Sequence, residues 1–288
     1  MPDSESRAYT DSLTEPRPPE SSPDAVPSPA FRRFVLLFIV MAVLVALAAL
    51  VSSAARWKKE VVVRGFVVDG ELIIPEREIL SRLADYKGAN LQELDTNGLK
   101  QRIMVLPYLK DAVITRELNG LVRVRVVERE PVALAAFDRS TMVIDREGSL
   151  LPWRKEVAAR FPDLFLIGGI SRLTTNERGL QQLERRDVAL ILQFLDALSK
   201  SEYASLLIRE MHLAANNLSW CIAVQAPTRF IIGNDGNFKE KLKKFEIFWQ
   251  KVVSKKGVGF YDTVDLRFRE RIFTTVPQSL EEQPGFTQ

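Results

Sequence analysis

The stretch that decides the fold runs from Phe34 to Val51, FVLLFIVMAVLVALAALV, and contains no charged or polar side chain. As an α-helix it would rise about 27 Å, close to the thickness of a bilayer's hydrocarbon core, with its backbone hydrogen bonds satisfied internally. We predict one membrane-spanning helix over residues 34–55. A buried helix of a soluble core is the first alternative, but such helices rarely lack polar residues all round. A signal peptide cleaved at Ser53-Ala54-Ala55 is the second, although the apolar run and the segment before it are long for one.

The segment before this helix, residues 1–33, is rich in proline and serine and lacks the apolar surface needed to offset the entropy of ordering. We predict a disordered tail. It carries four basic and six acidic residues, a net charge of −2, so the chain's +3 leaves +5 for the remainder. That charge is too small and too dispersed to indicate nucleic-acid binding. Basic residues flank the apolar run on both sides, so charge alone does not fix its orientation. We expect a cytoplasmic tail and an extracytoplasmic main part.

Residues 56–131 show the order β-α-α-β-β. Apolar residues recur at helical spacing twice, and β-branched residues dominate the strands. Asn119-Gly120 is the preferred two-residue hairpin turn, and the run Glu128–Glu130 is expected to be a solvated strand end. The elements are a strand over 61–68, a helix opened by Pro75 and ended by Gly88, a helix between Thr96 and Pro107, and strands over 109–118 and 121–127.

Residues 132–276 read as a β-rich region with packing helices, and 277–288 as a second disordered tail. Gly148 takes the turn position that needs positive φ. The expected strands cover 142–145, 149–151, 164–167, 206–213, 219–225, 228–232, 261–268 and 272–276, and the expected helices cover 179–200 and 238–252. The predicted fold class is α+β: a single transmembrane helix, the β-α-α-β-β domain and a mixed β-sheet domain.

A set of short motifs, each weak alone, occurs in order and at family spacing. It resembles the polypeptide-transport-associated (POTRA) domain and, beyond it, the β domain of the FtsQ/DivIB family of bacterial cell-division proteins. The family usually has a proline-containing turn where this chain has Asn119-Gly120. The motifs are Val68-Asp-Gly70, Ile74-Pro-Glu76, Gly88-Ala-Asn90-Leu91, Leu106-Pro107-Tyr108, Glu128-Arg129-Glu130-Pro131, Phe230-Ile-Ile-Gly233, Lys241-Leu242 and Val264-Asp265-Leu266-Arg267-Phe268.

The last strands are the candidate functional site. A sheet that ends in a C-terminal strand exposes unpaired backbone groups, to which a partner's strand can add. The alternative is an edge that is merely the last strand, blunted by Arg269, Glu270 and Arg271. A proline at Phe273 is expected to abolish partner binding while the protein stays folded and membrane-bound. The candidate residues are Leu266, Arg267, Phe268, Arg271, Ile272, Phe273, Thr274, Thr275 and Val276.

The resemblance implies a bitopic scaffold of the divisome in the inner membrane at the division septum, which binds the small division proteins FtsB and FtsL through these strands. It implies no cofactor and no small-molecule substrate. Two other classes stay open: a POTRA-type chaperone of protein export and a membrane-tethered cell-wall enzyme. An export protein would continue into a long array of membrane strands, and an enzyme would need a deep polar pocket.

The residues themselves argue against catalysis. The single histidine, His212, lies in a strand pattern, and the single cysteine, Cys221, lies in an apolar strand, where an inert thiol is expected. One cysteine also allows no internal disulfide. There is no Cys/His cluster of zinc-ligand spacing and no phosphate-binding loop. We expect no catalytic residue, no metal site and no nucleic-acid partner.

Overall fold

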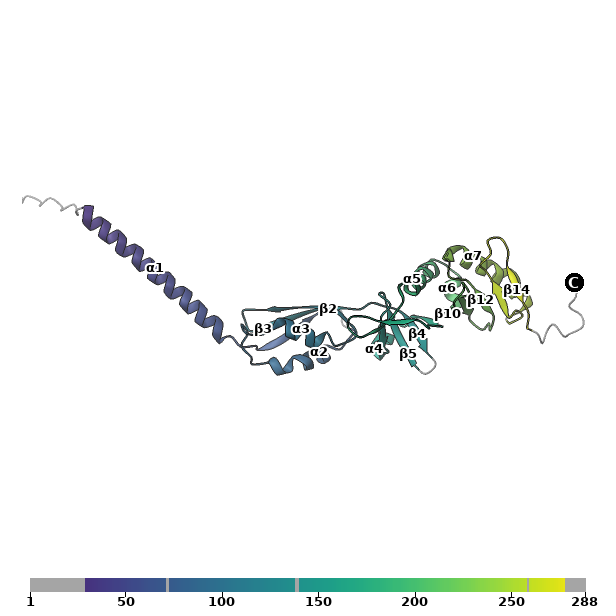
Figure 1. Ribbon diagram of the computed structural model, residues 1–288, viewed down its shortest axis with the longest axis horizontal. Helices are drawn as coiled ribbons and strands as arrows, with labels where there is room; N and C mark the ends of the chain where they lie inside the picture. Colours follow the sequence, from purple (N-terminus) through teal and green to yellow (C-terminus); the bar gives the residue numbers. More distant parts are fainter. Residues whose placement is uncertain (1–28, 71–72, 138–139, 258, 278–288) are drawn as a thin grey trace, which may run out of the picture. The chain divides into compact units, whose positions relative to one another are not determined.

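The computed structural model describes residues 29–70, 73–137, 140–257 and 259–277, apart from the side chains of 29–32 and 54–60 (Figure 1). The predicted disordered tails lie almost wholly outside these residues. The chain divides into two units, Met1–Lys59 and Glu60–Gln288. The first contains one long helix, α1 (Pro29–Glu60), whose window Arg33–Ser53 has a mean hydropathy of 3.3 and is not buried. By length and composition this helix can cross a membrane.

The second unit begins with a three-stranded sheet, in the predicted order β-α-α-β-β. The central strand β3 pairs in parallel with β1 and antiparallel with β2. The Asp95 side chain caps α3 by accepting a hydrogen bond from the Asn97 amide. The elements are β1 (Gly65–Asp69), α2 (Glu76–Leu83), the 3₁₀ turn η1 (Ala84–Tyr86), α3 (Thr96–Ile103), β2 (Leu109–Arg116) and β3 (Leu121–Glu128).

Three local predictions in this region are corrected. The first strand starts at Gly65 rather than at Val61. Val62 lies outside it and forms an isolated bridge with Asn90. The turn at Asn119-Gly120 is longer than two residues: the Gly120 amide donates to Glu117 O at 3.1 Å, and the Glu117 amide donates to Leu121 O. Arg129 is not a solvated strand end. It is buried, 6% exposed, and bonded to Asp145.

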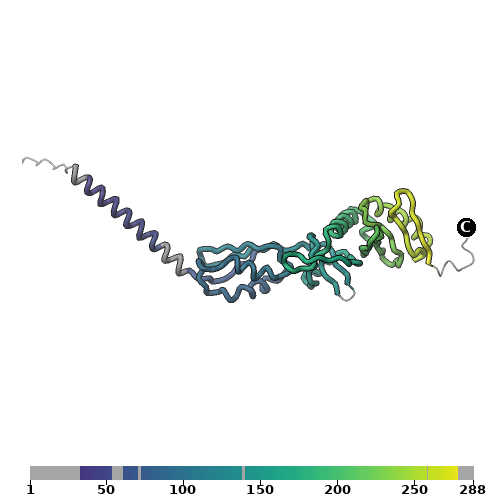
Figure 2. The backbone as a smooth tube through the Cα atoms, in the orientation of Figure 1, coloured from purple at the N-terminus to yellow at the C-terminus, as the bar shows by residue number. Residues whose placement is uncertain are grey.

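A nine-stranded mixed sheet forms the rest of the unit, in the order β14-β13-β12-β11-β10-β7-β4-β5-β6. Figure 2 shows β13 and β14, in yellow, side by side at the C-terminal border. The turn between β5 and β6 places Gly148 at φ +84°, as predicted. The strands are β4 (Pro131–Phe137), β5 (Ser140–Asp145), β6 (Leu150–Pro152), β7 (Phe165–Gly168), β10 (Ile208–His212), β11 (Trp220–Ala223), β12 (Arg229–Ile231), β13 (Thr263–Asp265) and β14 (Phe273–Thr275).

Helices α5 and α7 pack on each other and on the buried side chains of this sheet. The Phe230 ring of β12 meets the Phe245 ring of α7 edge-on, with centroids 4.8 Å apart, and Phe194 of α5 joins the same core. The helices are α4 (Lys155–Arg160), α5 (Arg185–Ser199), α6 (Ala204–Leu207) and α7 (Phe238–Phe248), which continues into the π-helical segment η2 (Trp249–Val253) and α8 (Ser254–Lys256).

The helix predicted from residue 179 starts only at Arg185. The residues before it form a small hairpin, β8 (Leu173–Thr175) and β9 (Gln181–Leu183), which the sequence did not reveal. Contacts to the turn after β5 explain the difference, because the Leu183 amide donates to Gly148 O at 2.9 Å.

The two sheets share one boundary with a common core. Val143, Leu151 and Val157 from the nine-stranded part are buried together with the core of the three-stranded part. The Tyr108 hydroxyl donates to Pro152 O at 2.7 Å, and the Arg178 guanidinium donates to Leu109 O at 2.5 Å. Glu60–Gln288 therefore forms one compact unit.

Candidate functional site

The two edges of the nine-stranded sheet differ in whether another segment of the chain lies beside them. At the β6 edge, the β8–β9 hairpin lies alongside: Gln182 forms a bridge with Ser149, and its side-chain amide donates to Glu147 O at 2.7 Å. At the other edge, β14 pairs with β13 alone among the strands that the structure describes, and its three residues are all exposed. The predicted edge strand is therefore at the border of the sheet (Figure 1).

The main chain of β14 alternates between its two sides. Thr275 O accepts a hydrogen bond from the Asp262 amide at 2.9 Å, so the backbone groups of Thr275 point toward β13. In a strand, neighbouring residues direct these groups to opposite sides. Thr274 therefore directs its N–H and C=O to the open side, whereas Phe273 directs its own toward β13.

Two aromatic side chains lie beside this open edge. The rings of Phe268 and Phe273 meet edge-on, with centroids 4.8 Å apart. They remain 47% and 51% exposed, a large fraction for phenylalanine. Arg271 is exposed and makes no ion pair with any residue that the structure describes. These side chains give the edge a small apolar surface next to a free cation.

The Arg267 side chain is bonded to other residues of the fold instead of being open at the edge. Its guanidinium binds the Asp265 carboxylate through two nitrogens, Nε to Oδ1 at 2.9 Å and Nη2 to Oδ2 at 2.6 Å, and Nη1 donates to Asn217 O. Burial opposes ionisation of Asp265, but the hydrogen bonds from Arg267 outweigh it and hold the Asp265 pKa below its usual value. The side chain is thus engaged inside the fold.

The remaining candidates divide by burial. Leu266 is fully buried, and its amide donates to Ile231 O at 2.9 Å. Ile272 and Val276 are half-buried. The residues whose side chains are open to a partner are Phe268, Arg271, Phe273, Thr274 and Thr275.

Sequence reasoning missed one residue of this region. Lys244 of α7 donates from Nζ to Leu266 O and to Phe268 O, both at 2.7 Å. Its place on a charged helix carried no signal, because the carbonyls it binds are more than twenty residues away in the chain.

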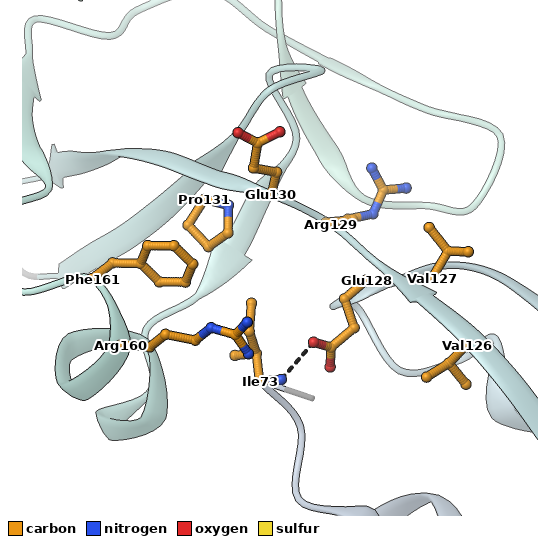
Figure 3. A pocket seen from close by; sticks show the side chains of 9 residues that line it. All are labelled: Ile73, Val126, Val127, Glu128, Arg129, Glu130, Pro131, Arg160 and Phe161. Carbon is orange, nitrogen blue, oxygen red and sulfur yellow. Dashed lines mark hydrogen bonds between the residues drawn. The ribbon is translucent and has the colours of Figure 1, made fainter. Parts of the chain in front are cut away.

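Two hollows bear on the question of catalysis. The first, of about 300 Å³, lies between the two sheets and contains Glu128 and Arg160 (Figure 3). Burial raises the Glu128 pKa, yet this carboxylate already accepts hydrogen bonds from the amides of Ile73 and Ile74. It serves the main chain of the fold.

The second hollow is an open groove of about 840 Å³ between α5, α6 and α7. Asp196 pairs there with Lys200 at 2.6 Å, and Glu246 accepts from the Ser201 hydroxyl and the Ala204 amide. Within the described part of the chain, no group of three His, Cys, Asp or Glu side chains is arranged to hold a metal ion. Neither hollow shows a pair of free carboxylates.

His212 and Cys221 lie on strands, as expected. The His212 ring stacks on Trp220 with centroids 4.0 Å apart, and its Nε2 lies 3.2 Å from Glu210 Oε1. Cys221 is fully buried, and burial raises the pKa of its thiol, which keeps it protonated and unreactive.

Comparison with known proteins places these features in a family. Residues 61–129 match the model of the FtsQ-type POTRA domain, and residues 130–275 match that of the FtsQ/DivIB C-terminal related domain. The cell division protein FtsQ of Rhodothermus marinus is 29% identical over 254 residues, covering 84% of this chain and 86% of that protein. DivIB of Clostridium acetobutylicum is 26% identical over 210 residues, covering 70% and 78%. With its anchor-like helix, POTRA fold and mixed sheet, the chain belongs to the FtsQ/DivIB family.

Proposed function

We propose that this protein is a membrane-anchored scaffold of the bacterial division machinery. The relatives that match most of its length are named cell division proteins FtsQ and DivIB. The helix α1 supplies a single anchor. In the proposed topology, the tail 1–33 is cytoplasmic, the helix 34–55 crosses the inner membrane, and the POTRA domain 56–131 and β domain 132–276 face outward at the septum.

The open edge at β14 carries this proposal. Binding works through backbone pairing: a strand of an FtsB- or FtsL-like partner adds to the outward N–H and C=O groups of Thr274. The exposed Phe268 and Phe273 rings supply apolar contact beside it. At the opposite edge the chain's own hairpin forms a bridge to Ser149 beside β6, which supports β14 as the edge for strand addition.

The test is a proline at Thr274. Its N–H points away from β13, so Thr274→Pro removes an outward donor while the β13–β14 pair stays intact. Phe273→Pro, suggested by the sequence, would remove an inward group instead. Thr274→Val keeps the N–H and is the matched control. We expect crosslinking pull-downs from dividing cells to lose FtsB- and FtsL-like proteins with Thr274→Pro and to retain them with Thr274→Val.

Equal recovery of these partners by both variants, at equal membrane levels of folded protein, would rule out strand addition at this edge. Loss of the partners with the valine variant as well would assign binding to the side chain rather than the backbone.

A further inference from the structure

The connection between β13 and β14, residues 266–272, lies outside the strand pairing, so its carbonyl groups need other hydrogen-bond donors. Lys244 reaches this connection from α7 and binds two of them, Leu266 O and Phe268 O, each at 2.7 Å. Its side chain is only 15% exposed, and its nearest carboxylate, Glu240, lies 3.7 Å away. A lysine so placed has lost most of its hydration and is held by its carbonyl partners.

The same connection is fixed a second time by Arg267, which joins Asp265 of β13 to the Asn217 carbonyl in the loop between β10 and β11. The segment that leads into β14 is therefore tied to the helix layer by one cation and to a neighbouring loop by another. The strand β14 itself is three exposed residues long and pairs with one strand, so these two ties at its entry add to the backbone bonds to β13 and to the hydroxyl contact between Thr263 and Thr275.

We propose that Lys244 is a positioning residue that holds the β14 edge in its binding-competent form. This inference rests on the proposed function, since it concerns how the same edge receives a partner strand. A strand can add only to an edge that is already extended and paired with β13. If the connection loosens, the competent fraction falls, and the apparent affinity falls by the same factor.

A residue that positions the edge and a residue that contacts the partner affect different rate constants of binding. A residue that sets the competent fraction controls association, whereas dissociation from the formed complex is unchanged because the partner's backbone bonds are intact. A residue that touches the partner acts mainly on dissociation. A residue that only stabilises the whole fold lowers the melting temperature, with no change in association once the folded fraction is equal.

The experiment uses the full chain in detergent and its organism's purified FtsB-like protein, immobilised for kinetic binding. Lys244→Met keeps the aliphatic stem and removes the ammonium. Lys243→Met is the matched control, since Lys243 is exposed on the same helix and pairs with no described residue. We expect association about tenfold slower for Lys244→Met, the loss typical of charge-assisted hydrogen bonds, with dissociation unchanged. Lys244→Arg should restore association, and Lys243→Met should leave it as it was.

Amide hydrogen exchange without partner gives a second readout. Residues 266–275 should exchange faster in Lys244→Met than in Lys243→Met, while the strands β10 and β11 stay equally protected. Unchanged association and exchange in Lys244→Met would overturn the positioning role, and so would faster dissociation. Thr274→Pro separates the two proposals: if it binds normally the proposed edge is wrong, and if it alone abolishes binding only the role of Lys244 is wrong.

Discussion

At the scale of single residues, the buried pair Arg129–Asp145 shows what a charge-rich run can hide. The Arg129 Nη1 donates to Asp145 Oδ2 at 2.6 Å and to the Ser149 hydroxyl at 3.1 Å, with side chains 6% and 2% exposed for the ionic pair. Asp145 also accepts from the Ser149 amide at 2.7 Å. The pair ties the end of β3 to the turn between β5 and β6.

We predict that Arg129→Met destabilises the folded unit by about 3 kcal/mol, because it leaves a buried carboxylate without its counter-ion. Arg125→Met, at an exposed position on the preceding strand β3, should change stability by less than about 0.5 kcal/mol. Chemical denaturation of both variants measures the difference. Equal midpoints would mean that Asp145 is satisfied by its backbone donors alone.

From the sequence, the charged run 128–130 is predicted to be a solvated strand end, and this prediction misses the burial of Arg129. Alternation along β3 buries even-numbered residues such as Val126 and would leave Arg129 exposed. The pattern shifts where the strand ends, so Arg129 is buried and Glu130 is exposed. The partner Asp145 is sixteen residues away, a separation that no local pattern reports. Lys244 and Arg267 are similar cases, since each is recognisable only when its carbonyl or carboxylate partner is in place.

At the scale of elements, the turn between β2 and β3 depends on a glycine for two reasons. Gly120 has φ +87°, and a Cβ there would lie 2.7 Å from Val62 O. Gly88 has the same φ, but a Cβ there would meet nothing within 4 Å. A side chain at position 88 therefore adds backbone strain alone, whereas a side chain at position 120 adds backbone strain and a steric clash.

We predict that Gly88→Ala costs about 1 kcal/mol, the strain of a left-handed alanine. Gly120→Ala should cost at least about twice as much, because the segment at Val62 must also move. Thermal unfolding followed by tryptophan fluorescence compares the two. A similar loss of stability in both variants would show that the segment at Val62 moves away at little energetic cost.

Sequence patterns found elements with strong periodicity or clear turn residues, such as α7 and the Gly148 turn. They missed the β8–β9 hairpin because its strands are three residues long, largely exposed and without alternation. That hairpin is held by tertiary contacts, including the Leu183 amide to Gly148 O. The same contacts converted the first residues of a predicted helix into a strand.

At the scale of the whole folded unit, the boundary between the two sheets carries a bidentate ion pair. Arg154 donates to both oxygens of Glu78, at 2.8 and 2.9 Å. These hydrogen bonds, against the opposing effect of burial, lower the Glu78 pKa. A lowered carboxylate pKa stabilises the fold above the unfolded-state value near 4.5 and loses that contribution as the pH falls through the folded-state pKa.

We predict that the stability difference between the natural chain and Glu78→Gln is largest near neutral pH and is lost as the pH falls from 4.5 through the lower folded-state pKa. Because both side chains are partly solvated, the difference should stay below about 1 kcal/mol. Denaturation midpoints measured between pH 3 and 7 give the profile. A difference that grew on acidification would contradict the pair's contribution.

The hairpin that lies along β6 also limits how large an assembly this sheet can build. A building block with two reactive ends propagates a polymer, whereas one with a single reactive end terminates it. With the chain's own hairpin bridged to Ser149 beside β6, the nine-stranded sheet has one open end among the described residues, and a strand added at β14 would not be relayed across this sheet to a further copy. The geometry thus favours discrete, countable complexes over open-ended fibres.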